Sequence, residues 1–561
     1  MKKGIYLLGL GVLLLLCMDL QAKVRLPHFF SSNMVLQRDM PIRVWGKADK
    51  NEVISVALNG SVQTAKTGKD GIWRVELPAM KAGGPYDMQI ESAEETIGLT
   101  NILIGDVWVC SGQSNMEFGL NNVINAGQEI AASTLPDIRL LNVPKNMQSK
   151  EQFDLEPCEW TACNPQTSPL FTAVGYFFGK ELQPEIGVPV GLIHTSWGGT
   201  DIETWTSWET AVKTNDTYKK YAGKDQEKAM GYSMDNIRLY KEALKKDKGL
   251  VQKWYVPAYK TKGWKTMAVP KVWEAELANE DGIVWLRKTI DLPAGVTGKK
   301  ARINLGAVDD EVLTYVNGVK VGEMNFWMPN RSYEIPAGVL KGGNNVIAVR
   351  ITDTGGLGGI LGKAEEVYLE IDGQRYSLAG DWVYKPSVVT SMYKVSGISP
   401  NSFSSLLYNG MVHPLIGYGI KGVIWYQGEN NAGRAYQYRT LFPAMINDWR
   451  QKWGIGYFPF IYVQLPNFGP VDQKPSEEGQ GWRWVREGQL KALALPNTAM
   501  AVTIDVGDPF DLHPIDKYDV GHRLALAARK LAYGEKIIAS GPLYQSMTIR
   551  RLFISVIAEA D

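Results

Sequence analysis

The sequence predicts an α/β protein in which a β-rich domain precedes the central α/β domain and another is inserted into it. Strand-like and helix-like segments alternate over residues 106–262 and again over 385–538, which indicates a parallel sheet covered by helices. The blocks 23–105 and 263–384 instead show short alternating strands separated by turn residues, a pattern typical of β-sandwiches. With 561 residues the chain is too long for a single core, so several domains are expected.

Residues 1–22 are typical of a secretory signal peptide. Lys2 and Lys3 precede an apolar run over residues 5–17, and a plausible cleavage point follows Ala22. The run is too short for a membrane span. We therefore expect an exported protein, periplasmic or extracellular, without a membrane-spanning segment.

Composition and motifs argue against several functional classes. The formal net charge is +1 with acids and bases interspersed, so no nucleic-acid partner is expected. Metal chemistry has little support because His-Glu-x-x-His and zinc-like cysteine spacings do not occur, and without a Gly-x-Gly-x-x-Gly or phosphate loop no cofactor is expected. Signal cleavage would leave Cys110 as a buried strand residue, and Cys158 and Cys163 close enough in sequence to form a disulfide.

The β-rich blocks contain several clear strands. Residues 53–58 run into Asn59-Gly60, a strong hairpin signal, and residues 71–77 alternate before Pro78. In the inserted block the strands are predicted at 284–290, 314–316 and 345–351, with a turn at Asn317-Gly318. The Lys-rich stretch 213–262 is expected to form a surface helix beside the first part of the α/β domain.

The α/β blocks can be divided into elements in chain order. Strands are predicted at 106–110, 190–193, 422–426, 460–464 and 499–504, and helices at 171–183, 435–453 and 520–533. In a parallel sheet the loops after the strands meet at one edge, where ligands bind.

Gly112-Gln113-Ser114-Asn115 follows the first of these strands. A serine on a tight strand-to-helix turn exposes its hydroxyl beside backbone N–H groups that can hold an anion, as an acyl-transfer nucleophile requires. The turn alone is a weak signal, because Gly-x-Ser-x is common.

His513 is the best candidate for the base. Of the five histidines it alone follows a strand end by a short acidic loop and precedes the last helix. Asp511 could orient its imidazole and stabilise the imidazolium. Alone, His513 would more commonly be a helix-entry residue and Asp511 a solvated acid. His413 lacks nearby acids in the sequence, which favours a structural role.

Two further segments offer oxyanion donors. Gly198-Gly199 follows a strand, and glycines let a backbone N–H approach a substrate closely. Gln427 follows another strand and carries a side-chain amide donor, while Glu429 is expected to support this loop. Glycine pairs usually mark turns and polar residues past strands are usually solvated, so the shared position at strand ends carries the functional interpretation.

Together these segments resemble the sialate O-acetylesterase family of SGNH-type serine hydrolases. The similarity covers nearly the whole mature chain through four ordered motifs: residues 108–117 (WVCSGQSNME), 191–204 (GLIHTSWGGTDIET), 422–430 (GVIWYQGEN) and 505–525 (DVGDPFDLHPIDKYDVGHRLA). The resemblance implies a flavodoxin-like three-layer α/β/α domain that removes acetyl groups from O-acetylated sugars without a metal. It assigns Ser114 as nucleophile, His513 as base and Gly198 or Gly199 as the glycine donor, with Gln427 replacing the asparagine usual in the superfamily.

Three features depart from or add to this resemblance. The superfamily places its aspartate three residues before the histidine, where this chain has Phe510, so Asp511, Asp508 or a backbone carbonyl could orient His513. Relatives commonly continue into a C-terminal β-domain, of which residues 539–561 are expected to be a truncated remnant. The inserted block 263–384 resembles the jelly-roll sugar-binding domain of family 2 glycoside hydrolases through residues 285–288, Asp309-Asp310 and residues 315–318.

The sequence thus leads to an exported serine esterase acting on acetylated carbohydrates, with O-acetylated sialic acids as the first substrate class. Two alternatives stay open: an acetyl xylan or hemicellulose esterase, and a non-catalytic glycan-binding protein built on a degenerate hydrolase core.

Overall fold

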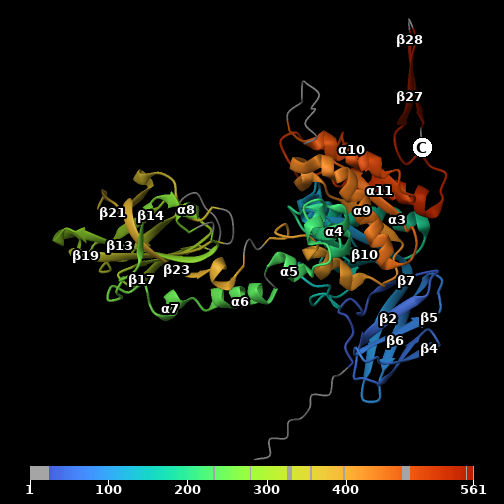
Figure 1. Ribbon diagram of the computed structural model, residues 1–561, viewed down its shortest axis with the longest axis horizontal. Coiled ribbons are helices and arrows are strands. Elements are labelled where there is room, and N and C mark those ends of the chain that lie inside the picture. Colours follow the sequence, from blue (N-terminus) through green and yellow to red (C-terminus); the bar gives the residue numbers. More distant parts are fainter. Residues whose placement is uncertain are drawn as a thin grey trace, which may run out of the picture. The chain divides into compact units, whose positions relative to one another are not determined.

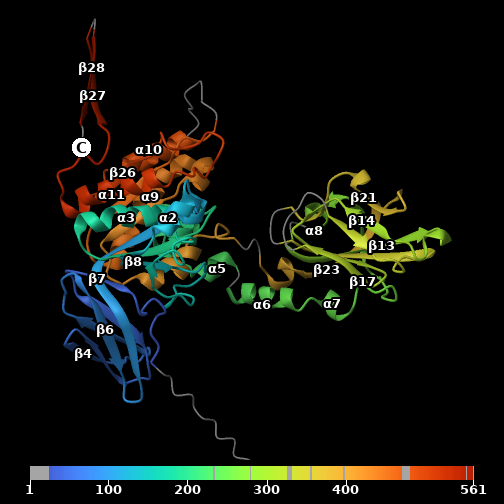
Figure 2. The same ribbon diagram turned by 180° about the vertical axis from the view of Figure 1, so that it is seen from behind.

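The computed structural model describes residues 24–231, 234–277, 280–324, 331–353, 357–395, 399–469, 481–550 and 553–559. The predicted signal peptide lies outside them. The chain folds into two compact units, shown in Figures 1 and 2. Unit 1 comprises Met1–Met147, Glu151–Lys219 and Leu407–Asp561, and unit 2 comprises Gln148–Lys150 and Lys220–Leu406.

A parallel sheet forms the centre of unit 1. Its strands run in the order β26-β25-β24-β7-β10-β8, and β9 adds to the β8 edge in antiparallel orientation. Their bounds are β7 (Thr96–Gly112), β8 (Leu135–Asn142), β9 (Thr161–Cys163), β10 (Val190–Ser196), β24 (Gly422–Tyr426), β25 (Phe460–Gln464) and β26 (Thr498–Val502). Each predicted strand of the α/β blocks is present. The two blocks interrupted by the insertion therefore supply a single sheet.

Helices cover both faces of this sheet. Trp108 of β7 packs on Phe178 of α3 (Ala173–Ile186) and contacts Tyr533 of α11 (Tyr518–Tyr533). Trp425 of β24 packs on Trp449 of α9 (Ala435–Trp453). Because Trp425 pairs with Ser111, three residues from Trp108, the two tryptophans point to opposite faces. On the α9 side α10 (Trp482–Ala492) also packs, through Gln489 against Tyr462.

The N-terminal region of unit 1 consists of two smaller antiparallel arrays. β2 (Ile42–Lys47) pairs with β5 (Ile72–Leu77), while β3 (Val53–Leu58) pairs with β4 (Ser61–Lys66) and β6 (Gly83–Glu91). β6 pairs in turn with the first half of β7, which also pairs with β1 (Val35–Gln37). The long strand β7 thus runs from the N-terminal region into the central sheet. The predicted hairpin at Asn59-Gly60 is confirmed.

Unit 2 is built mainly of antiparallel sheets. The largest has the order β11-β23-β13-β19-β16-β17 and a second has the order β18-β14-β21-β22. Their bounds are β11 (Lys265–Val269), β13 (Gly282–Leu292), β14 (Ala301–Leu305), β16 (Glu311–Val316), β17 (Val319–Met324), β18 (Ser332–Ile335), β19 (Gly343–Asp353), β21 (Val367–Ile371), β22 (Gln374–Ser377) and β23 (Gly380–Val389). A shared apolar core includes side chains of both sheets.

Unit 2 extends beyond the predicted block 263–384 at both ends. The Lys-rich stretch 213–262 forms several short helices instead of one, among them α5 (Gln226–Met230), α6 (Met234–Lys245) and α7 (Lys248–Val251). Asp247, just before α7, is buried and accepts hydrogen bonds from Trp285, Arg350 and Ser387 of the large sheet. Since a buried carboxylate must be paired, this contact binds the helical stretch to the sheet.

Cys110, Cys158 and Cys163 are free thiols, so the suggested bridge between Cys158 and Cys163 is not formed. Burial raises the pKa of both of these thiols to about 12. β27 (Leu543–Arg550) and β28 (Phe553–Glu559) pair with each other as a hairpin. No helix in the described ranges combines the length and apolarity needed to cross a membrane.

Candidate active site

Three strands of the central sheet end at the same level. In the register of the sheet, Gly112 at the end of β7 pairs with Ser196 at the end of β10 and with Tyr426 at the end of β24. The loops that follow these strands therefore begin side by side, as predicted for the carboxyl edge of a parallel sheet. Ser114 lies two residues past the end of β7, Gly198 lies two residues past the end of β10, and Gln427 lies one residue past the end of β24.

The turn that carries Ser114 is fixed by its neighbours. At Gly112, with φ +142°, a Cβ atom would lie 2.0 Å from the Tyr426 carbonyl oxygen, so only glycine fits. The Gln113 N–H donates to that oxygen (2.9 Å), and Gln113 Oε1 accepts the N–H groups of Gly428 and Asn430, both at 3.3 Å. Ser114 then begins α1 (Ser114–Glu117), with its N–H at a helix start.

The structure brings the predicted nucleophile and base together. Ser114 Oγ lies 2.8 Å from His513 Nε2, although the two residues are far apart in the chain. Burial lowers the pKa of His513 from its ordinary value, the positive charge of Lys517 lowers it further, and Asp511 opposes both. The lowered pKa favours the neutral imidazole, which is the form that can accept the serine proton.

The predicted orienting acids do not reach the imidazole. Asp511 Oδ1 accepts the backbone N–H of His513 at 2.8 Å, and Asp508 Oδ1 accepts that of Phe510 at 2.8 Å. Both carboxylates are therefore engaged in local loop turns. This corrects the expectation that Asp511 orients the ring through a hydrogen bond: it acts on His513 by charge and by shaping the loop.

Gly198 lies against the nucleophile but its N–H is engaged. A Cβ atom at Gly198 would lie 3.1 Å from Ser114 Cβ, which leaves little room for any side chain. Its N–H donates to Glu117 Oε2 at 2.6 Å, and Glu117 Oε1 lies 2.5 Å from Lys145 Nζ. Gly199 follows with φ +67° and open space on its Cβ side. The predicted donor thus holds a carboxylate oxygen beside Ser114.

Gln427 is part of the support of the site rather than an oxyanion donor. Its Nε2 donates to the Thr200 carbonyl (3.0 Å) and to Asn431 Oδ1 (2.7 Å), which uses both amide hydrogens. Its Oε1 accepts the hydroxyl of Tyr438 at 2.8 Å. The fully buried amide therefore ties the loop after β24 to the loop after β10.

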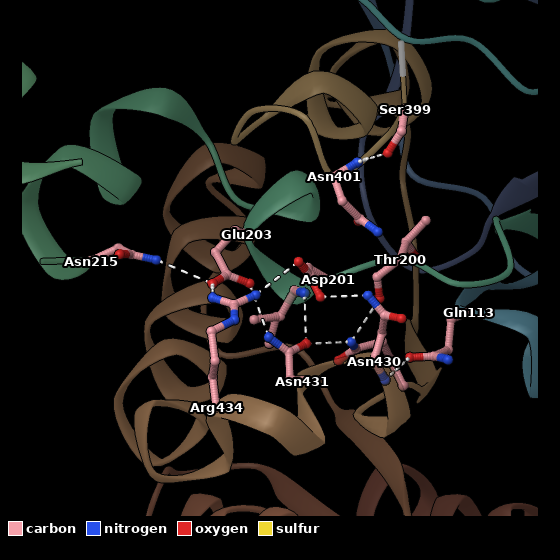
Figure 3. Close-up of polar contacts among 12 residues, drawn as sticks. Gln113, Thr200, Asp201, Glu203, Asn215, Ser399, Asn401, Asn430, Asn431 and Arg434 are labelled. Carbon is pink, nitrogen blue, oxygen red and sulfur yellow. Dashed lines mark hydrogen bonds and ion pairs between the residues drawn. The ribbon is translucent and has the colours of Figure 1, made fainter. Parts of the chain in front are cut away.

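A second set of contacts between the same two loops is shown in Figure 3. The Arg434 guanidinium contacts Asp201 (2.8 Å) and Glu203, and Asn430 Nδ2 donates to Asp201 Oδ1 at 2.6 Å. Asn431 Nδ2 donates to Glu203 Oε2 at 3.0 Å. Burial raises the pKa of Asp201, which shows that its charge is held in a poorly solvated position.

Comparison with known proteins agrees with this geometry. The family described as "Carbohydrate esterase, sialic acid-specific acetylesterase" matches residues 104–239 and 397–530, which flank the insertion and include Ser114 and His513. The chain belongs to this esterase family. Sialate O-acetylesterase of Rattus norvegicus is 26% identical over 92% of this chain and 76% of its own length, and that of Homo sapiens is 25% identical over 97% and 78%. A crystal structure of a carbohydrate acetylesterase from Xanthomonas citri has a TM-score of 0.60 and 28% identity, covering 96% of this chain and 82% of that one.

Membership of the family makes the protein a carboxylic ester hydrolase.

The other histidines of the protein lie in different surroundings from His513. In this esterase His413 Nε2 lies 3.3 Å from Glu151 Oε2 and its Nδ1 2.8 Å from the Gln152 carbonyl. An acid therefore does lie beside His413, contrary to the interpretation from sequence, because it comes from a segment far away in the chain. Burial lowers the pKa of His194 to about 3, and its ring contacts Asn142 and Ser196.

Three residues of the esterase site were missed by sequence reasoning. Asn115 Nδ2 donates to Glu429 Oε1 (2.7 Å) and to the Leu512 carbonyl (3.0 Å), and its Oδ1 accepts Lys517 Nζ (2.5 Å). Glu117 holds the Gly198 N–H. Asn115 and Glu117 stand inside the Ser114 motif, so their position was visible but not their partners. Lys517 offered one signal, a cation at the start of a helix, where the helix dipole disfavours it.

Proposed function

We propose that the protein is an exported serine esterase that removes O-acetyl groups from carbohydrates, with O-acetylated sialic acids as its substrate class. The observation that carries this proposal is the 2.8 Å contact between Ser114 Oγ and His513 Nε2. The names of the relatives from Rattus norvegicus and Homo sapiens support the substrate class. The strand order and the helices on both faces support an SGNH-type, flavodoxin-like α/β/α domain.

In this proposal Ser114 is the nucleophile and His513 the general base. Ser114 Oγ attacks the acetyl carbonyl carbon while its proton passes to His513 Nε2. The tetrahedral intermediate collapses, the bond between the acetyl carbon and the sugar oxygen breaks, and the imidazolium protonates that oxygen. Water then loses a proton to His513 and attacks the acetyl-enzyme, which releases acetate and restores the Ser114 hydroxyl.

We assign the binding of the oxyanion to backbone N–H groups in the loops that follow β7 and β10. Ser114 is the first residue of α1, so its N–H has no acceptor within that helix. The Gly198 N–H lies close to Ser114 and can serve only after Glu117 Oε2 has released it, while Gly199 is the adjacent candidate. Gln427 and Glu429 hold these loops in place.

The decisive experiment measures acetate release by the mature protein and by Ser114→Ala. We expect the substitution to lower kcat by about 10⁴-fold or more, as for other serine hydrolases, with the fold retained. Equal rates would exclude Ser114 as nucleophile. Sugar binding without detectable acetate release by the wild type would identify a non-catalytic glycan-binding protein instead.

A panel of acetylated substrates tests the substrate class. The wild type should release acetate faster from O-acetylated sialic acids than from acetylated xylan, with Ser114→Ala inactive on both. The reverse order would assign the same chemistry to a hemicellulose esterase. An electrophoretic comparison of precursor and mature forms after expression with residues 1–22 intact tests export.

A further inference from the structure

A buried amide connects the segment that carries the nucleophile to the segment that carries the base. Asn115 directly follows Ser114, and its Nδ2 donates to the carbonyl oxygen of Leu512, which directly precedes His513. The second Nδ2 hydrogen goes to Glu429 Oε1 at 2.7 Å. Asn115 is completely buried, so water does not replace these contacts easily. The separation between Ser114 and His513 therefore depends on where this amide is held.

Lys517 holds the other end of that amide. Its Nζ donates to Asn115 Oδ1 at 2.5 Å, and the ammonium lies over the rings of Phe118 and Tyr426, 4.8 and 5.6 Å from their centres. The side chain is 1% exposed. A buried lysine is costly unless its charge is compensated. Lys517 and Glu429 are thus compensating charges joined through the Asn115 amide.

Burial disfavours the ammonium form of Lys517, whereas the charged groups around it, Glu429, Asp511 and Asp516, all favour that form. The balance lowers the pKa of Lys517 to about 7. Burial raises the pKa of Glu429, while Asn115 and Lys517 lower it. Burial and the positive charge of Lys517 both lower the pKa of His513 from its ordinary value.

We propose that Lys517 is a positioning residue of the esterase: through the Asn115 amide it holds Ser114 and His513 at hydrogen-bonding distance. This inference rests on the proposed function. It assigns two effects to one side chain, a geometric effect on kcat and an electrostatic effect on the pH dependence.

The test compares the pH–rate profiles of the wild type, Lys517→Met and Lys517→Gln. Removal of the cation raises the pKa of His513, so the acid limb of kcat/KM should move to higher pH in both variants. Loss of the hydrogen bond to Asn115 Oδ1 should lower kcat by about 10–100-fold in Lys517→Met. The loss should be smaller in Lys517→Gln, which keeps a donor. Lys530→Met, which removes a lysine from the same helix away from the site, should match the wild type in both respects.

A merely structural role for Lys517 would lower activity at every pH without moving the acid limb, and this result in folded variants would overturn the proposal. If Lys517→Met does not fold, Lys517→Gln, which keeps a donor to Asn115 Oδ1, decides. His513 can be assigned among the five histidines by NMR with His513→Gln, and its titration is then compared between the folded Lys517 variant and the wild type. We expect its imidazole to titrate at higher pH in the variant than in the wild type, and an unchanged or lower titration midpoint would contradict the proposal. Absence of acetate release by the wild type, or full activity of Ser114→Ala, would instead contradict the proposed function.

Discussion

The two halves of the site are built differently. On the nucleophile side, Ser111, Gln113 and Asn115 are almost completely buried, and backbone hydrogen bonds fix the turn at the edge of the sheet. On the base side, the loop before His513 is largely exposed, and Phe510 is 96% exposed. Loops of this kind are more mobile than the strands that carry them. The position of the base therefore depends on a few side-chain contacts, whereas that of the nucleophile follows from the sheet.

The largest expected effect on kcat comes from removing either the nucleophile or the base. His513→Ala should lower kcat about as much as Ser114→Ala, by about 10⁴-fold or more, because the serine needs its base. The double variant should be no slower than the single variants, since groups that act as a unit lose their function together. Single-turnover acetate release measures all three. Rates that fall multiplicatively in the double variant would mean that Ser114 and His513 act independently.

A second substitution tests whether the rigidity of the nucleophile side comes from its buried amides. Gln427→Leu removes the donor to Thr200 and Asn431 and the acceptor of the Tyr438 hydroxyl. We expect the free energy of unfolding in urea to fall by about 3 kcal/mol, because buried polar groups lose their partners. In the folded fraction kcat should fall by less than about tenfold. A loss of about 10²–10³-fold without destabilisation would instead assign Gln427 to the oxyanion.

The same contrast explains what the sequence could and could not predict. The strands at 422–426 and 460–464 and the helix at 435–453 agree with β24, β25 and α9 because local periodicity and burial act together there. Ser114 and His513 were identifiable because strand ends collect at one edge of a parallel sheet. The partners of Asp511, Gln427 and Gly198 were not, since each depends on the direction of a side chain in a loop. Sequence spacing alone does not determine such directions.

The smallest and most specific effect is expected at Asp511. Its carboxylate accepts the His513 backbone N–H and raises the pKa of the imidazole by charge, opposite in sign to Lys517. Asp511→Asn keeps an acceptor for the loop turn but removes the charge, so the pKa of His513 should fall and the acid limb of kcat/KM should move to lower pH. The rate at neutral pH should change by only a few-fold, much less than the 10⁴-fold loss expected when a hydrogen-bonded triad aspartate is replaced.

Asp508→Asn is the matched control, because its carboxylate makes the equivalent contact with Phe510, one turn earlier in the same loop. It should leave both the rate and the acid limb unchanged. A loss near 10⁴-fold in Asp511→Asn would show that this carboxylate turns to the imidazole during catalysis, and the base side would then move between two arrangements while the nucleophile side does not. A small loss with an acid limb at lower pH would show that the charge of Asp511, whose effect on the pKa of His513 is opposite in sign to that of Lys517, helps to set the pH at which the esterase works.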